Sequence, residues 1–183
     1  LEQAILKVPD SVEALNNLGL VYSFQGSAEA AFLCMAKANR LSPDNVEILC
    51  NLATVYMAQG LFAESESACR KALAIQTDCA SAYYQLAQLT NGKNAELLIE
   101  NIAKALGQGQ TTPIQEMKFR FGLAKLFEDQ EKYDEAFACL VKANELKRKT
   151  FTFTLDPLAK MVDRICQVYD EKTLHRFAGR GAK

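Results

Sequence analysis

The chain has 183 residues, of which 49% are hydrophobic and 23% are charged. That hydrophobic content is ample for a packed core, and 9 glycines with 4 prolines are too few for a disordered chain or a turn-rich β-fold. No run approaches the ~20 apolar residues of a membrane span, so we expect a cytoplasmic protein that binds no membrane.

The formal net charge of -1 hides an uneven distribution. Residues 1–141 carry 11 Lys and Arg against 17 Asp and Glu, whereas residues 142–183 carry 10 against 5. A basic end can bind nucleic acid, but single-strand binders also interleave aromatic residues with the basic ones, and this chain does not. We therefore expect no nucleic-acid partner, and read the cations as complements to helix C-termini.

A period of thirty-four residues organises the first half of the chain. The segment 12–45 is followed by a near-copy, 46–79, and residues 1–11 fit the tail of a truncated preceding repeat. Each copy predicts two helices, at 12–25 and 28–41 and then at 46–59 and 62–75. Gly26 and Gly60 provide the positive φ that ends the first helix of each pair. Small residues that let the paired helices approach recur at fixed places: Gly19, Ala53, Ala31, Ser65, Ala38 and Ala72.

The second half continues the pattern less regularly. A third unit, 80–116, predicts helices at 80–90 and 95–106, and a fourth, 117–150, predicts helices at 114–129 and 133–148. Ala124, Ala136 and Ala143 take the small places of the fourth unit. The period then ends, and residues 151–183 predict an extended segment at 151–155, a helix at 157–169 that caps the array, and a linker toward a missing downstream domain.

These repeated residues resemble the tetratricopeptide repeat, a helix–turn–helix unit of this length. The resemblance implies an all-α, right-handed α-solenoid with a C-terminal capping helix and no β-sheet. In such an array the first helix of each unit lines a concave groove that binds a protein or peptide segment.

Catalytic and metal-binding groups are sparse. The chain has one histidine, His175, and six cysteines, none in a C-x-x-C pair, so zinc and iron–sulfur spacings are missing. Scattered cysteines of this kind are typical of buried, reduced thiols in the cytosol. No glycine-rich loop joins a strand to a helix as phosphate binding requires. We expect no catalytic, metal or cofactor-binding residue in this chain, and hence no enzyme in the residues present.

The second, fifth, sixth and ninth places of each first helix are expected to face the groove. Primary amides occupy the sixth place in three units, at Asn17, Asn51 and Gln85, and Phe121 follows in the fourth. Such amides can pair with the backbone of an extended peptide, as in the asparagine ladder that this pattern resembles in O-linked N-acetylglucosamine transferases. The alternative is that they bond neighbouring helices. The other candidate groove residues are Asn16, Leu20, Cys50, Thr54, Tyr84 and Gln88, a lining without charge that predicts weak, salt-insensitive binding.

Residues 80–178 also resemble the N-terminal half of bacterial tetratricopeptide-repeat sulfotransferases. That resemblance implies a substrate-recruiting region whose parent enzyme uses 3′-phosphoadenosine-5′-phosphosulfate in a domain beyond Lys183. The alternative is a stand-alone adaptor with no enzyme domain. A homodimer is also open, because a truncated first repeat leaves apolar surface.

Overall fold

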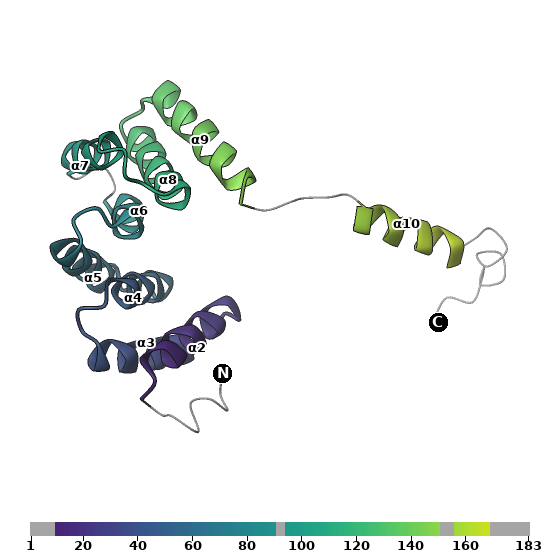
Figure 1. The fold of residues 1–183 in the computed structure, drawn as a ribbon, viewed down its shortest axis with the longest axis horizontal. Coiled ribbons are helices and arrows are strands. Elements are labelled where there is room, and N and C mark those ends of the chain that lie inside the picture. The colour runs from purple at the N-terminus through teal and green to yellow at the C-terminus, as the bar shows by residue number, and fades with distance from the viewer. Residues whose placement is uncertain (1–9, 91–93, 151–155, 169–183) are drawn as a thin grey trace. The chain divides into compact units, whose positions relative to one another are not determined.

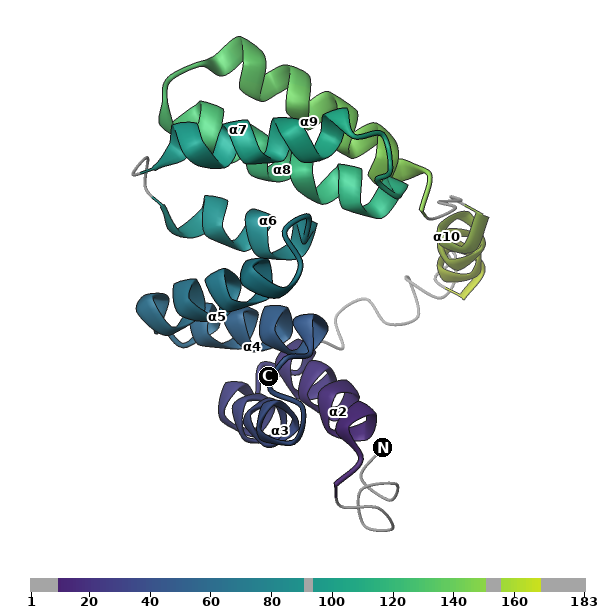
Figure 2. The same ribbon diagram turned by 60° about the vertical axis from the view of Figure 1, so that its left-hand side comes forward.

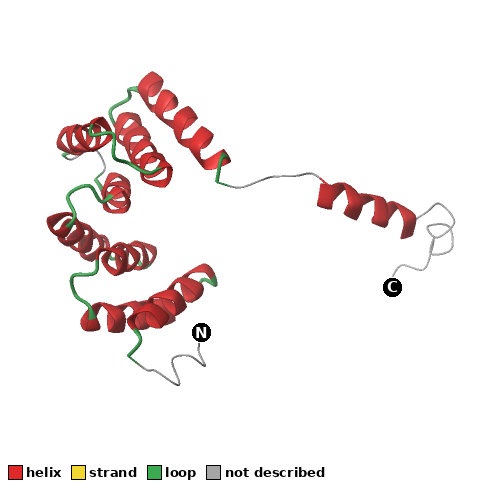
Figure 3. Cartoon of the chain, viewed as in Figure 1, coloured by secondary structure: helices red, strands yellow, loops and turns green. Residues whose placement is uncertain are grey.

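The computed structural model describes residues 10–90, 94–150 and 156–168, and all regular structure in these ranges is α-helical (Figure 3). The helices are α2 (Val12–Phe24), α3 (Ala28–Leu41), α4 (Val46–Ala58), α5 (Phe62–Ile75), α6 (Ala80–Leu89), α7 (Ala95–Gly107), α8 (Pro113–Asp129), α9 (Tyr133–Arg148) and α10 (Asp156–Val168). The all-α prediction is confirmed, and every predicted helix boundary lies within one residue of the observed one. The truncated repeat before Asp10 and the extended segment 151–155 lie outside the described residues.

The chain divides into two compact units, residues 1–147 and 148–183. In the first unit, α2 to α9 follow one another as an array of antiparallel helices, an α-solenoid (Figures 1 and 2). The second unit contains α10, which is described below by itself.

Local sequence signals set the ends of the first helices. Ser11 caps α2 by accepting a hydrogen bond from the Ala14 N–H, and Asn45 caps α4 by accepting from the N–H groups two and three residues later. At the other end of each helix, Gly26 and Gly60 both adopt φ of 76°. The predicted positive φ is thereby confirmed, and the chain reverses into α3 and α5.

Small side chains hold the paired helices close together. Ala31, Ala53 and Ala72 are completely buried, and the Ser65 hydroxyl donates a 2.8 Å hydrogen bond to the Ala53 carbonyl across the α4–α5 contact. At Gly19 an added Cβ would lie 2.7 Å from Met35 Cγ, so a larger residue at this contact of α2 with α3 would displace Met35. The small places therefore have the packing role that the repeat predicts.

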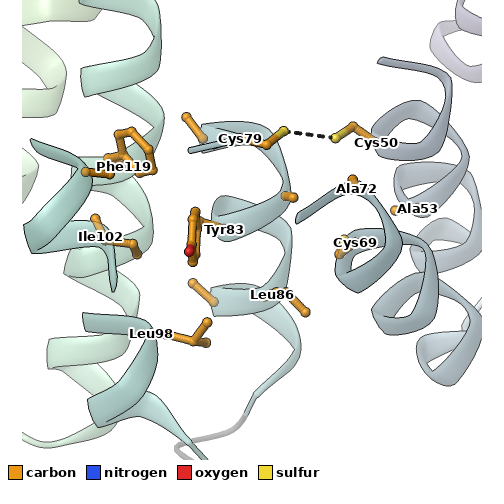
Figure 4. Close-up of a cluster of buried hydrophobic side chains, with 14 of the residues drawn as sticks. Cys50, Ala53, Cys69, Ala72, Cys79, Tyr83, Leu86, Leu98, Ile102 and Phe119 are labelled. Carbon is orange, nitrogen blue, oxygen red and sulfur yellow. Dashed lines mark hydrogen bonds between the residues drawn. The ribbon is translucent and has the colours of Figure 1, made fainter. Parts of the chain in front are cut away.

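The hydrophobic core is divided. One continuous cluster runs through α4, α5, α6, α7 and α8, and Figure 4 shows part of it around Tyr83 and Phe119. The contacts of α2 and α3 belong to two smaller clusters, one around Met35 and one around Leu15 and Ala38. The first pair of helices thus packs on α4 through clusters that are separate from the large one.

The third unit departs from a regular helix pair. α6 packs much more extensively on α8 than on α7, which follows it in the chain. The Tyr83 and Phe119 rings, one from α6 and one from α8, lie 5.9 Å apart. Gly122 faces α6 at this contact, where an added Cβ would lie at an ordinary contact distance of 3.6 Å from both Ala87 and Tyr84. α7 adds Ile102 to the same contact, so three helices share one interface.

α10 is amphipathic. It begins at Asp156, one residue before the predicted start. Leu158, Met161, Val162 and Ile165 recur at the spacing of one helix face, and all four are exposed. The capping role of this helix stays a prediction.

Candidate functional site

A hollow of about 400 Å³ lies across the first helices of four successive units. It extends over α2, α4, α6 and α8, and its lining includes Leu20, Glu47, Asn51, Ser81, Gln115 and Lys118. Helices that are distant in sequence contribute because each unit repeats the same orientation. We refer to this hollow as the groove pocket.

A second hollow of about 360 Å³ lies farther along the array, between α8 and α9. Its lining includes three of the predicted site residues, Tyr84, Gln88 and Phe121, beside the exposed rings of Tyr133 and Phe137. Some of the predicted site residues therefore line one or the other of these two hollows, and others line neither. Leu20, Cys50 and Asn51 line the groove pocket, while Asn16, Asn17, Thr54 and Gln85 line neither of these two hollows.

Two of the predicted amides form a network between α2 and α4. The Asn51 Nδ2 group donates a 2.9 Å hydrogen bond to Asn16 Oδ1, and the Asn16 Nδ2 group donates a 3.0 Å bond to Glu47 Oε1. Asn16 is only 5% exposed. Both its donor and its acceptor therefore hold neighbouring helices together, which is the alternative that the sequence left open for these amides.

Gln85 likewise forms a hydrogen bond between the first helices of two successive units, α6 and α4. Its Nε2 group donates a 2.7 Å hydrogen bond to the Thr54 hydroxyl, which in turn donates to the Cys50 carbonyl. Gln85 is 8% exposed, and its Oε1 atom is buried without a hydrogen-bond partner. In the predicted ladder, Asn17 alone is half-buried with no side-chain hydrogen bond among the described residues.

Phe121 does not continue the series of amides. Counted from Met117, which puts Ala124 and Ala136 at the small places, the sixth place of the fourth unit is Gly122. Gly122 is buried against α6, whereas Phe121 lines the second hollow. The predicted correspondence at Phe121 was therefore wrong by one residue, and the sixth place carries an amide in the first three units only.

The groove pocket is also charged, which corrects the prediction of an uncharged lining. Glu47 and Lys118 both line it, and the Lys118 ammonium donates a 2.7 Å hydrogen bond to the Ser81 hydroxyl. These three residues occupy the second place of successive units. The sequence predicted that this place faces inward, and that signal was sufficient to find them.

The part of the chain that the structure describes contains no group of three His, Cys, Asp or Glu side chains arranged to hold a metal ion. Among the same residues, no helix combines the length and the apolar character needed to cross a bilayer.

Comparison with known proteins identifies the repeats. Models described as "Tetratricopeptide repeat" match residues 25–89 and residues 118–150, together more than half of the chain. The chain is a tetratricopeptide-repeat protein. Repeats of this family are typically non-catalytic scaffolds for protein–protein interaction, in agreement with the expectation of no enzyme in the residues present.

Solved structures share the tetratricopeptide-repeat fold at low sequence identity. The crystal structure of MamA is 22% identical, covers 81% of this chain and 85% of its own, and superposes with a TM-score of 0.57. The pilF protein of Pseudomonas aeruginosa is 22% identical over 76% of this chain and 63% of its own, with a TM-score of 0.63. At these identities the likeness shows the fold alone.

A curated relative from Aquifex aeolicus, described as an uncharacterized protein, is 34% identical over 61 residues. The matched segment is 33% of this chain and 8% of the relative.

Proposed function

We propose that this tetratricopeptide-repeat array binds an extended protein segment in the groove pocket. The observation that supports the proposal is a hollow of about 400 Å³ that four successive units line with both apolar and polar side chains. Extended peptides fit such a surface because they offer backbone donors and acceptors along their whole length.

The charges indicate which segment fits best. The Lys118 ammonium spends one of its three N–H donors on Ser81, which leaves others for a carboxylate of the ligand. The Glu47 carboxylate accepts from Asn16 and has further lone pairs for a donor of the ligand. We therefore expect a segment that carries an acidic side chain near Lys118. Because these charges are close to solvent, the affinity falls as salt rises, in place of the salt-insensitive binding predicted from the sequence.

The test is a titration of unstructured peptides, with and without acidic residues, against the parent chain and a Lys118→Met variant. Lys104→Met on α7 is the matched control, since Lys104 is exposed and lies outside the groove pocket. We expect Lys118→Met to weaken binding of acidic peptides about tenfold, as for loss of one charge-assisted hydrogen bond. Equal binding by the parent and Lys118→Met would exclude this pocket as the site.

The predicted amide ladder is tested by the double variant Asn17→Ala, Asn51→Ala. If peptide backbone pairs with these amides, the double variant binds all peptides more weakly, whatever their charge. Asn51 also holds α2 to α4, so the double variant is used only if its circular dichroism and melting temperature match those of the parent. Unchanged binding by the folded double variant removes the ladder from the mechanism.

The wider role of the protein remains a proposal with two forms. The resemblance of residues 80–178 to the repeat region of bacterial sulfotransferases supports a recruiting region for such an enzyme, and the alternative is a stand-alone adaptor. Reading the coding sequence past Lys183 distinguishes them, because the first form requires a strand followed by a donor-binding loop. We also propose that the protein is located in the cytoplasm and that it forms a homodimer. Sedimentation analysis at increasing protein concentration tests the dimer.

A further inference from the structure

Two cysteine thiols meet at the wall of the groove pocket. Cys50 lies on α4 and Cys79 directly precedes α6, and their Sγ atoms are 3.5 Å apart, pointing toward one another in Figure 4. Both residues line the groove pocket, and both are free thiols. Neither is used by the peptide-binding proposal.

The surroundings of the two sulfur atoms are unequal. Cys79 is the N-cap residue of α6, and although its side chain makes no full capping hydrogen bond, the N–H groups of Ala82 and Ser81 are close enough to favour its thiolate. The hydrogen bond from Cys50, these N–H groups and the Lys118 ammonium together lower the pKa of Cys79 below that of an ordinary thiol, against the opposing effect of burial. The same hydrogen bond, followed by burial, raises the pKa of Cys50. The N–H groups of Ser81 and Ala82 act on Cys79 and not on Cys50, so the thiolate form is favoured at Cys79 and the Cys50 thiol then donates to it.

We propose that Cys50 and Cys79 are a dithiol site that exchanges with small disulfides, with Cys79 as the attacking thiolate and Cys50 as the resolving thiol. The Cys79 sulfur attacks one sulfur of a low-molecular-weight disulfide, forms a mixed disulfide and releases one thiolate. The Cys50 thiol then loses its proton to solvent and attacks the Cys79 sulfur, which releases the second small thiolate. In sum, two protein thiols become one disulfide, and one small disulfide becomes two thiols.

The geometry allows the second step with little movement. A disulfide requires the sulfur atoms at about 2.05 Å, so the pair must close by roughly 1.5 Å, within the reach of side-chain rotation. α4 and α6 already pack in one core cluster, which holds the two residues face to face. Cys69, the other buried thiol of this region, is on α5 and does not line the groove pocket. Access from the pocket thus favours Cys79 over Cys69.

The experiment uses the full chain, reduced and then incubated with oxidised glutathione at neutral pH. Acid stops the exchange, the remaining thiols are alkylated in denaturant near neutral pH, and digestion with trypsin and a glutamate-specific protease separates Cys50, Cys69 and Cys79 into the fragments 48–64, 67–70 and 72–93. We expect fragment 48–64 to be joined to fragment 72–93, with a mass two hydrogens below the sum of the two free fragments, whatever glutathione adds to the exposed Cys166. The oxidised chain should also melt at a higher temperature, because the new bond constrains the unfolded state.

Single variants separate the two roles. Cys50→Ser should keep one glutathionyl group on Cys79, because the mixed disulfide cannot be resolved, and Cys79→Ser should leave Cys50 unmodified. Cys34→Ser on α3 is the matched control and should form the same cross-link as the parent. Circular dichroism of each variant verifies that it is folded. Modification of Cys34 or Cys69 before Cys79, a cross-link other than 50–79, or reaction only in denaturant would overturn the proposal.

Discussion

Asn16 and Asn51 join two successive units through a single amide–amide hydrogen bond of 2.9 Å. Glu47 completes the arrangement by accepting from Asn16, and it precedes Asn51 by one helical turn of α4. One buried side chain of α2 is therefore held at two points by α4, which sets the register between the first helices of the two units.

Replacing Asn16 with alanine should destabilise the fold. The change removes both hydrogen bonds and leaves the Asn51 amide unpaired at a half-buried position, at a cost of about 1–3 kcal/mol. The measurement is urea unfolding followed by circular dichroism. Asn17→Ala is the neighbouring control, because no side-chain hydrogen bond of Asn17 occurs among the described residues, and it should shift stability by less than about 0.5 kcal/mol. Similar losses in the two variants would contradict the role of the Asn16 network.

Two helix-interior glycines should respond to alanine in opposite ways. A Cβ at Gly19 would lie 2.7 Å from Met35 Cγ and 3.3 Å from the Ala31 carbonyl oxygen, so Gly19→Ala forces α2 and α3 apart and costs about 1–3 kcal/mol. At Gly122 the nearest atom is 3.6 Å away, an ordinary contact. Gly122→Ala should therefore be neutral or stabilise by up to about 1 kcal/mol through helix propensity. Thermal unfolding of both variants tests the contrast, which fails if Gly122→Ala is the more damaging change.

A large side chain at a position where the two helices of a unit meet through a small residue should lower the free energy of unfolding. Ala31 is fully buried and Ala136 is 6% exposed, so leucine at either position should cost about 1–3 kcal/mol by overpacking. Leu33, which is 63% exposed on α3, offers a control: Leu33→Ala should change stability little. Melting temperatures of Ala31→Leu and Ala136→Leu within a degree of the parent would mean that the helix interface has been wrongly assigned.

The buried amide of Gln85 allows us to predict the loss of stability when a buried polar group loses its hydrogen-bond partner. Thr54→Val removes the acceptor of Gln85 Nε2 and should cost about 1–3 kcal/mol, because the whole buried amide is then unpaired. Gln85→Met removes the unpaired Oε1 atom together with the hydrogen bond, keeps the length of the side chain, and should be close to neutral. Urea unfolding of both variants measures the difference, and a larger loss in Gln85→Met would refute this account.

Much of the fold could be predicted because short sequence signals within each repeat mark the helix ends and the helix faces that pack together. Gly26 and Gly60 mark the turns, and the small places identify the faces of the paired helices, so the boundaries of eight array helices followed from spacing. The packing of α6 on α8 could not be predicted in the same way. It brings Gly122 next to Ala87 of another unit, and a glycine within a helix has no periodic signal that names its partner.

The candidate site was predicted less well than the fold. The sequence identified which places face inward, but whether an inward amide bonds a ligand or the next helix depends on distances of a few ångströms between units. Asn16 and Asn51 meet because two units stack, and the charges of Glu47 and Lys118 converge on one pocket for the same reason. The proximity of Cys50 and Cys79 is likewise a product of stacking that their separation in the chain conceals.

The division of the hydrophobic core into separate clusters predicts which helices open locally while the rest of the array stays folded. Because α4 to α8 share one apolar cluster while α2 and α3 rest on smaller ones, the first pair should open without the rest. Native-state hydrogen exchange should then report two levels of protection: amides of α2 and α3 exchange through a partial opening, and those of α4 to α6 only through global unfolding. A first pair that opens separately also exposes its backbone to proteases, so limited proteolysis should cut within α2 and α3 before it cuts the later helices.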